Sequence, residues 1–98
     1  MEKGTPHYSL TKAKGFLATG EVRTTGSAQK GAAALGMSQA DMFDVVRRLT
    51  SKDFYKSMTT HSDHTIWQDV YRPHTEFGQI YLKLTVIDDV LIVSFKEK

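Results

Sequence analysis

Residues 78–86 alternate in polarity almost without exception, and no other feature constrains the fold of this chain as strongly. The aliphatic side chains stand at the even positions, namely Ile80, Leu82, Leu84 and Val86. The polar side chains and one phenol stand at the odd positions, namely Gln79, Tyr81, Lys83 and Thr85. Successive side chains of a β-strand point to opposite faces, so the pattern predicts a strand with one buried and one open face. Its register is strongly fixed, because a slip of one residue would bury the lysine.

Other segments in the second half of the chain are predicted to pair with this strand in an antiparallel sheet. Phe54–Thr60 and Thr65–Arg72 flank a polar turn at residues 61–64, which predicts a hairpin. Pro73 ends this hairpin, because proline cannot donate to a strand ladder. Val90–Lys96 follows after a tight turn and is apolar on both faces at its start, as a central strand would be.

The first half of the chain has helical rather than strand periodicity. Ser9 is the predicted N-cap of a helix over Leu10–Thr19. A second helix, closed by Gly36, is expected to start at Thr25 or Ser27. A third helix begins with the capping box of Ser38 and Asp41 and carries a regular apolar stripe of Met42, Val45, Val46 and Leu49. Helices followed by antiparallel strands predict an α+β fold, with the N-terminal helices packed on one face of the sheet.

Length and composition limit the classes of protein to consider. The 98 residues allow a single domain with a modest core, because domains commonly hold about 100 to 150 residues. No apolar run approaches the ~20 residues that span a bilayer, so no membrane association is expected. The start MEKGTPHYSL lacks the apolar segment of a secretory signal, which favours the cytoplasm. The absence of cysteine agrees with that location and excludes disulfides, thiolate zinc sites and a cysteine nucleophile.

The charge of the chain favours a polyanionic partner only weakly. The formal net charge is +2, and residues 54–98 carry five Lys or Arg against six Asp or Glu. Because no linear basic patch exists, binding to a polyanion would require folding to gather separate cations on one surface. The candidates for such a surface are Lys56, Arg72, Lys83 and Lys96.

Strand parity indicates which polar side chains lie together. Lys56 is expected on the same face as Phe54 and Met58. Tyr81 is expected beside Lys83, away from the aliphatic stripe of its strand. Neighbouring antiparallel strands then permit one concave surface that carries Lys56, Gln68, Arg72 and Tyr81.

These residue types suit cleavage of RNA by attack of a ribose 2′-hydroxyl on its own phosphate. Lysine and arginine supply fixed positive charge for a pentacovalent transition state, and glutamine orients a ribose hydroxyl or reads a base edge. A phenol beside cations serves as a proton donor or acceptor. The aromatic rings interleaved with these cations suit stacking on unpaired bases. The alternative is an ordinary solvent-exposed sheet face with solvated lysines and a packed tyrosine.

Other chemistries have weaker support in the sequence. His61 and His64 with Asp63 between them are more typical of a polar turn than of a metal site. The glycines form neither a phosphate-binding loop nor a dinucleotide fingerprint. Ser27 and Ser38 resemble helix caps rather than members of a hydrolase triad. No metal and no other cofactor is therefore expected.

Four stretches of the chain point to a known family. They are MEKGTPHYSL at 1–10, EVRTT at 21–25, KDFYKSMTTHSDHTIWQDVYRP at 52–73 and GQIYLKLTVIDDVLIVSFKEK at 78–98. Together they resemble the MqsR family, the motility quorum-sensing regulator toxins of bacterial toxin–antitoxin pairs. The resemblance implies a RelE-like microbial ribonuclease fold and a ribosome-independent mRNA interferase that prefers GCU sequences. It also implies a zinc-binding antitoxin, MqsA, encoded beside the toxin, with operator DNA contacted through their complex.

The resemblance also implies roles for particular residues. The implied catalytic group is Lys56, Gln68 and Tyr81, and the implied RNA contacts are Arg72 and Lys96, with Tyr55 and Met58 as weaker candidates. The chain departs from the family at Asp88, where the family carries a histidine, and the added negative charge is expected to weaken RNA binding. Two other functions remain open: a non-catalytic RNA-binding module that represses translation by occupancy, and a regulatory protein whose strand edge is completed by a partner.

Overall fold

The computed structural model describes residues 1–98 and contains helices in the first half of the chain and most of the strands in the second. The helices are α1 (Leu10–Ala18), α2 (Gly26–Ala34) and α3 (Gln39–Arg47). The strands are β1 (Glu2–Lys3), β2 (Val22–Thr24), β3 (Phe54–Thr59), β4 (Trp67–Tyr71), β5 (His74–Thr75), β6 (Gly78–Val86) and β7 (Val90–Glu97), and a 3₁₀ turn (Ser51–Asp53) precedes β3. None of the helices has the length and apolar character that crossing a bilayer requires.

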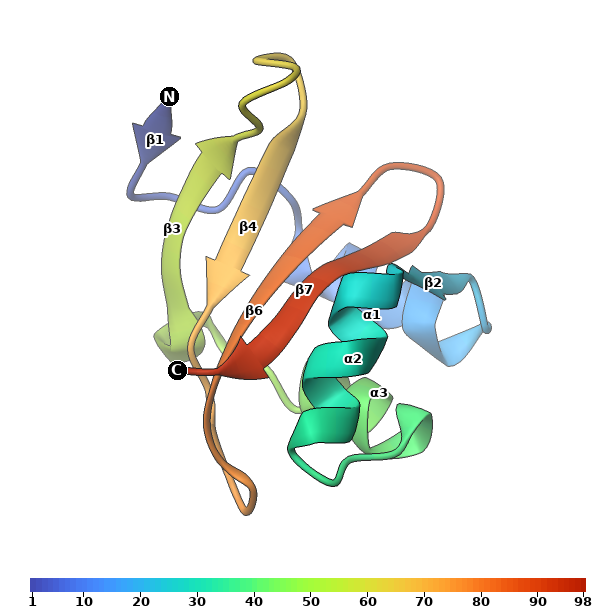
Figure 1. The fold of residues 1–98 in the computed structure, drawn as a ribbon. Coiled ribbons are helices and arrows are strands. Elements are labelled where there is room, and N and C mark those ends of the chain that lie inside the picture. Colours follow the sequence, from blue (N-terminus) through green and yellow to red (C-terminus); the bar gives the residue numbers. More distant parts are fainter.

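The strands form one sheet in the order β1-β3-β4-β6-β7-β2, with β5 paired to the start of β6. The β2–β7 pair is parallel, and all other pairs are antiparallel. This order sets the β3–β4 hairpin beside the β6–β7 hairpin (Figure 1). Residues that are separated by ten or more positions in the sequence therefore face one another across adjacent strands.

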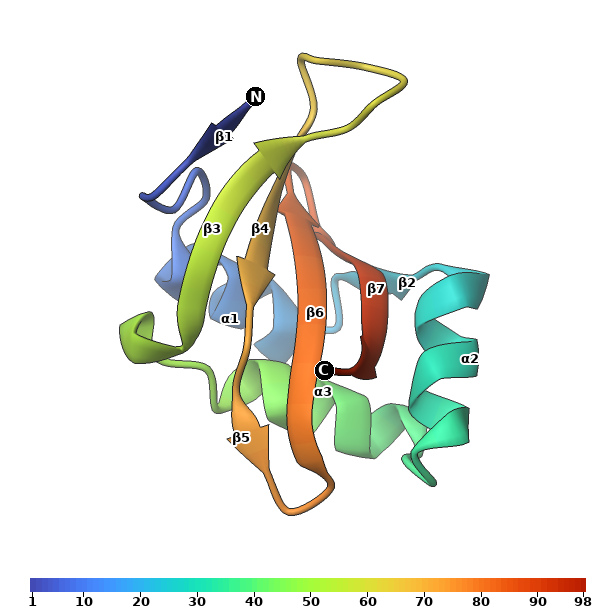
Figure 2. The ribbon, with the colours of Figure 1, turned by 60° about the vertical axis from the view of Figure 1, so that its left-hand side comes forward.

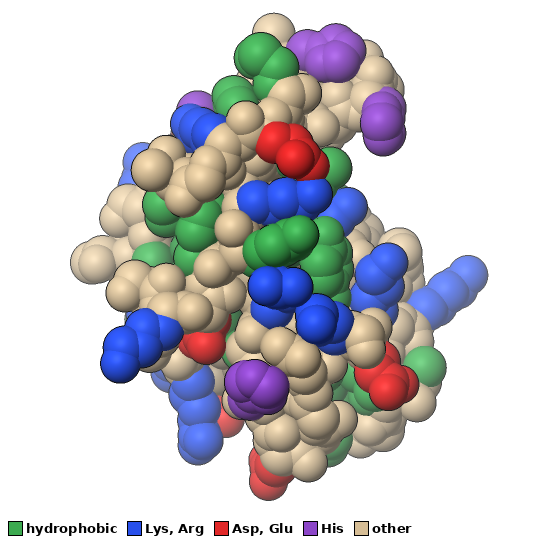
Figure 3. Space-filling view, turned by 90° about the vertical axis from the view of Figure 1, so that its left-hand side faces the viewer, with side chains coloured by type: hydrophobic (Ala, Val, Ile, Leu, Met, Phe, Trp, Pro, Cys, Tyr) green, Lys and Arg blue, Asp and Glu red, His purple; other side chains and the backbone are tan.

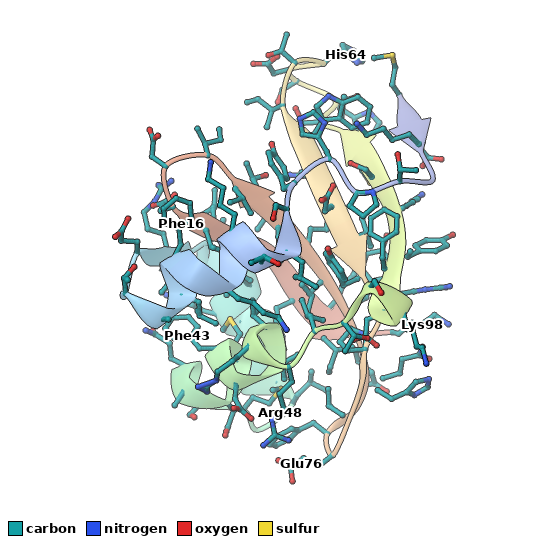
Figure 4. All side chains as sticks on the ribbon, turned by 180° about the vertical axis from the view of Figure 1, so that it is seen from behind. Phe16, Phe43, Arg48, His64, Glu76 and Lys98 are labelled. Atoms are coloured by element: carbon teal, nitrogen blue, oxygen red, sulfur yellow. The ribbon has the colours of Figure 1, made fainter.

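Helices α1 and α3 lie on one side of the sheet, α2 lies beside β7, and the other side of the sheet is open (Figure 2). Figure 4 shows α1 and α3 in front of the sheet when the molecule is seen from behind, and there Phe16 and Phe43 pack against the core. On this covered face Leu82 of β6 and Phe95 of β7 are almost completely buried. The alternation of residues 78–86 therefore has a simple cause, because the even positions of β6 face the helices and the odd positions do not.

The local signals that predicted the helices have the expected partners. The Ser9 side chain accepts a backbone N–H from the first turn of α1, and Ser38 and Asp41 form the reciprocal capping box of α3. Gly31 costs α2 helical propensity, yet the packing explains its presence. A Cβ atom at Gly31 would lie 1.7 Å from the carbonyl oxygen of Phe95, so the missing side chain lets α2 approach β7 closely.

The α+β fold class, with N-terminal helices on a mainly antiparallel sheet, is confirmed, and so are the positions of the main elements. The strand predicted over residues 78–86 has those bounds, and the second helix starts after Thr25 as N-cap. The hairpin strands are slightly shorter than predicted, at Phe54–Thr59 and Trp67–Tyr71. Sequence reasoning missed β1 and β5, because a two-residue strand has no periodicity to detect.

Candidate active site on the open face of the sheet

Cross-strand register brings the predicted site residues together on the open face, the side of the sheet without helices. Lys56 of β3 pairs with Val70 of β4, which pairs in turn with Lys83 of β6. Two further pairs lie on this face, Met58 with Gln68 and Tyr81 with Lys96. Directly paired residues of an antiparallel sheet point to the same side. The gathering of separate cations that polyanion binding would require is therefore present in the fold.

A β-bulge at the start of β3 decides where Tyr55 lies. Phe54 pairs with Tyr71 and packs against its ring at a centroid distance of 5.6 Å, on the covered face. The register then shifts, so Tyr55 and Lys56 both reach the open side. The expectation that Lys56 shares a face with Phe54 is therefore wrong, because the bulge breaks the alternation. The guanidinium of Arg72 stacks on the exposed Tyr55 ring, with the Arg72 Cζ atom 3.7 Å from the ring centroid.

Positive charge dominates the open face, where Figure 3 shows Lys and Arg side chains around a band of hydrophobic and aromatic ones. Burial lowers the pKa of Lys83, and the charges of Lys96 and Lys56 lower it further. The Lys96 ammonium lies 5.6 Å from the centroid of the Tyr81 ring. A cluster of like charges that are partly removed from water attracts an anion.

The short strand β1 adds an acid that the sequence gave no reason to expect. Glu2 pairs with Met58 on the open face, and its carboxylate forms an ion pair with the Lys56 ammonium at 2.5 Å. The hydrogen bond from Lys56 lowers the pKa of Glu2, and the same bond raises the pKa of Lys56. Lys56 is consequently held in its protonated form. No pattern in the sequence connects position 2 with position 56, so only the fold reveals this contact.

A second bulge interrupts the pairing of β6 and β7 beside Lys83. Lys83 pairs with Ser94, whereas the next residue of β6 pairs with Ile92, so Val93 has no partner on β6. The Val93 carbonyl instead accepts a hydrogen bond of 2.6 Å from the Thr25 hydroxyl, and Thr25 is also the N-cap of α2. Bulges bend a strand and redirect its side chains. Here the bulge separates residues 90–92 of β7 from residues 94–97, which include the candidate site residue Lys96.

A buried carboxylate on the opposite side of the hairpin holds the N-terminal segment in place. Asp69 is 1% exposed and accepts hydrogen bonds from the backbone N–H groups of His7 and Tyr8 at 3.0 and 2.9 Å. The Ser57 hydroxyl donates a third, at 2.6 Å. Such bonds to an ionised acceptor are stronger than neutral ones. They fix the segment that follows β1 and therefore the place of Glu2.

A cavity of about 350 Å³ lies away from the open face, between α3 and the turn after β5. Figure 4 labels Arg48 and Glu76 at this end of the molecule. Its carboxylates are largely engaged, since Asp41 caps α3 and Asp44 pairs with Arg48. These acids would repel a nucleic-acid phosphate, so the cavity does not qualify as the RNA site. No three His, Asp or Glu side chains of the chain are grouped as metal ligands.

Comparison with known proteins identifies the family. The family model described as motility quorum-sensing regulator, toxin of MqsA, matches residues 5–97. The chain belongs to this family. The mRNA interferase toxin MqsR of Escherichia coli (strain K12) is 60% identical over 98 residues, which is 100% of both chains. The resemblance to the MqsR family is thus confirmed, together with the α+β architecture expected of it.

Asp88, the expected departure from the MqsR family, lies exposed in the turn between β6 and β7. Tyr81 stands seven residues earlier, in β6, about 20 Å away along the sheet. That separation exceeds the screening length of roughly 8 Å at physiological salt. The predicted weakening of RNA binding by Asp88 should therefore be small.

Proposed function

We propose that this protein cuts single-stranded mRNA on the open face of its sheet, without a metal ion, by attack of a ribose 2′-hydroxyl on the adjacent phosphate. The class of activity follows from the family: the chain is an mRNA interferase toxin, an endoribonuclease. What supports the open face as the site is the convergence of five polar side chains, Lys56, Gln68, Tyr81 and Lys96 from four strands and Arg72 directly after β4.

Each proposed role follows from the surroundings of the side chain. Lys56 keeps its proton because Glu2 raises its pKa, which suits a fixed charge for the phosphate rather than a base. Tyr81 offers a hydroxyl that can donate or accept a proton, and the neighbouring Lys96 provides positive charge. Gln68 can both donate to and accept from a ribose hydroxyl or a base edge.

Tyr55 and Met58 are proposed to contact bases. Tyr55 is 42% exposed and its ring is backed by the Arg72 guanidinium, so the ring forms a stacking surface. Met58 stands opposite Gln68 and offers a polarizable apolar side chain beside an amide. We expect the GCU preference implied by the family resemblance to depend on these contacts.

The proposed reaction is balanced without an external nucleophile. The 2′ oxygen forms a bond to phosphorus while the bond from phosphorus to the 5′ oxygen breaks. One proton leaves the 2′-hydroxyl and one joins the 5′ oxygen. The products are a 2′,3′-cyclic phosphate and a 5′-hydroxyl end, and no oxidant or reductant takes part.

Cleavage of a defined RNA in EDTA tests the proposal. A single-stranded RNA with one GCU is expected to yield two fragments with a cyclic phosphate at the new 3′ end. Tyr81→Phe is expected to slow cleavage by about 10²- to 10⁴-fold, because it removes a proton carrier. Lys52→Ala, which truncates an exposed lysine next to β3, serves as the matched control for Lys56→Ala. Intact RNA with folded wild-type protein would contradict the proposal, and binding without products would favour the non-catalytic RNA-binding module.

We further propose that the partner is a zinc-binding antitoxin encoded beside this chain, in the cytoplasm where mRNA is found. The family description names MqsA as the antitoxin of these toxins. Operator DNA would be contacted only through the complex. A neighbouring reading frame with paired CxxC motifs and a helix-turn-helix, whose product copurifies with the toxin, is the expected result. A neighbouring product that lacks these motifs and does not bind the toxin would contradict it.

A further inference from the structure

Lys83 stands at the centre of the open face, among the residues proposed to contact RNA. Its cross-strand partners are Val70 on β4 and Ser94 on β7. Val70 has no exposed surface and so forms an apolar floor beside the lysine stem. Lys56 lies one strand beyond Val70, about 10 Å from Lys83 between backbones. A phosphate held between Lys56 of β3 and the half of β7 that follows Val93 must therefore lie over Lys83 or directly beside it.

Lys83 is a cation without a counter-ion. It makes no ion pair and no hydrogen bond, whereas Lys56 is held by Glu2. Its side chain is half-buried, and burial and two neighbouring ammonium groups lower its pKa. The titratable or charged side chains of the surrounding segments are Glu2 of β1, Tyr55 and Lys56 of β3, Arg72 directly after β4, His74 of β5, Tyr81 of β6, Lys96 of β7 and Lys98 directly after β7. The protein supplies one acid here, and that acid is already paired with Lys56.

We propose that Lys83 is a further catalytic residue of the RNA-cleaving site, whose ammonium contacts a non-bridging oxygen of the scissile phosphate. This inference rests on the function proposed above. As the 2′ oxygen bonds to phosphorus and the bond to the 5′ oxygen breaks, negative charge grows on the non-bridging oxygens, and a fixed cation stabilises that charge. Lys83 gives up no proton in the step. Other groups, such as Tyr81, accept the proton of the 2′-hydroxyl and donate a proton to the 5′ oxygen.

Phosphate binding at Lys83 should be linked to proton uptake. In the free protein the lowered pKa leaves Lys83 partly neutral as the pH rises into the alkaline range. A bound phosphate favours the ammonium, so the complex binds more protons than the free protein, and affinity should fall as the pH rises. Lys56 has a raised pKa and contributes little in the same range. An arginine at position 83 stays charged throughout, so it should abolish this part of the uptake.

Kinetics of two variants test the catalytic role. Lys83→Met is expected to lower kcat for a GCU-containing RNA by about 10²- to 10³-fold with a smaller change in KM, because the charge acts mainly in the transition state. Lys83→Arg should restore kcat to within about tenfold of the wild type, because the positive charge remains. Lys30→Met, an exposed lysine on α2, is the matched control. Thermal unfolding verifies that each variant is folded, and an unchanged kcat in folded Lys83→Met would overturn the inference.

Calorimetry with an uncleavable probe tests the contact separately. The probe is the same RNA with a single 2′-deoxy nucleotide at the cleavage position, titrated at about pH 9 in two buffers of different ionisation enthalpy. Wild-type protein should take up protons on binding, and Lys83→Arg should take up fewer. Equal uptake by the two proteins would overturn the inference. Absence of cleavage by the wild type would refute the proposed function and this inference with it, whereas an active wild type with equally active Lys83 variants would refute this inference alone.

Discussion

Leu82 and Lys83 are neighbours in β6, yet their side chains enter opposite surroundings. Leu82 has no exposed surface and lies on the face that the helices cover. Lys83 lies on the open face between an apolar floor and other cations. Burial of an aliphatic side chain stabilises the fold by roughly 1.5–3 kcal/mol, whereas a half-buried ammonium without a partner opposes it. Alternation within one strand thus separates the residues that maintain the fold from those available for chemistry.

Two neighbouring residues of β4 depart from this separation, because one is apolar on the open face and the other is charged on the covered side. Val70 is an apolar residue buried on the open face, where it lies between Lys56 and Lys83. Asp69 is a carboxylate buried on the opposite side, where it binds the segment that follows β1. A change at Asp69 can therefore reach the open face through Glu2. The two faces are separable along β6 and coupled at β4.

Leu82→Ala should give the largest effect on stability. Deleting a fully buried leucine side chain is expected to lower the free energy of unfolding by about 2–5 kcal/mol, because it removes apolar burial and leaves a cavity. RNA cleavage per folded molecule should be unchanged at a temperature where the variant is folded. Urea denaturation and cleavage rates measured on the same sample check both statements. Reduced kcat in fully folded Leu82→Ala would contradict the separation of the two faces, because it would show that the covered face also affects the chemistry.

Asp69→Asn should show the coupling between the faces. An amide in place of the carboxylate cannot accept from all three donors, and we expect a loss of about 1–3 kcal/mol in unfolding free energy. Amide hydrogen exchange at His7 or Tyr8 should become faster, because one of the two carboxylate oxygens that accept from their N–H groups is replaced by a donor. Ser57→Ala removes a single donor and should have a smaller effect. Unchanged exchange at both amides would show that the N-terminal segment is held by other contacts.

Tyr71 should make the stability of the covered face sensitive to alkaline pH. Burial, with the nearby Asp69 and Asp53 carboxylates, raises the pKa of Tyr71 to about 12. An unfolded chain releases the phenolic proton near its ordinary value of about 10, so between these pH values the unfolded state binds fewer protons and stability falls as the pH rises. The contribution is about 2 kcal/mol and is fully present below about pH 10. It should be absent from Tyr71→Phe.

The control for this prediction uses a second tyrosine. Tyr8 also has a raised pKa, from burial and from Asp69, so the wild type is compared with Tyr71→Phe rather than examined alone. Urea denaturation at about pH 9 and about pH 11.5 gives the loss of stability for each protein. Equal losses in the two proteins would show that Tyr71 titrates normally in the folded state.

The sequence predicted the sheet and the gathering of most candidate site residues on one face, because both depend on period-two alternation in long strands. Residues 78–86 show this best, because nine consecutive residues have the predicted bounds and faces. What could not be predicted depends on irregularity: the bulge that turns Tyr55 to the open face, and the two-residue β1 that brings Glu2 to Lys56. Neither has a periodic signal, and both depend on pairing between strands far apart in the sequence.

Arg72→Lys should give the smallest effect, and it tests how the open face binds RNA. The substitution keeps the charge and removes the planar group that stacks on the Tyr55 ring. We expect RNA binding to weaken about two- to fivefold, in line with ~0.5–1 kcal/mol for an exposed cation–π contact. The dependence of binding on salt should be unchanged, because the number of charges is the same.

A double-mutant cycle with Tyr55→Leu decides whether the stack itself contributes to binding. If the guanidinium holds the ring in position for a base, the two substitutions should be coupled, and the double variant should bind RNA almost as well as the weaker single variant. If Tyr55 and Arg72 act independently, their effects on the binding free energy should add. Additive effects would show that Arg72 binds phosphate from beside the ring, and that the open face holds RNA by charge without a prearranged stacking surface.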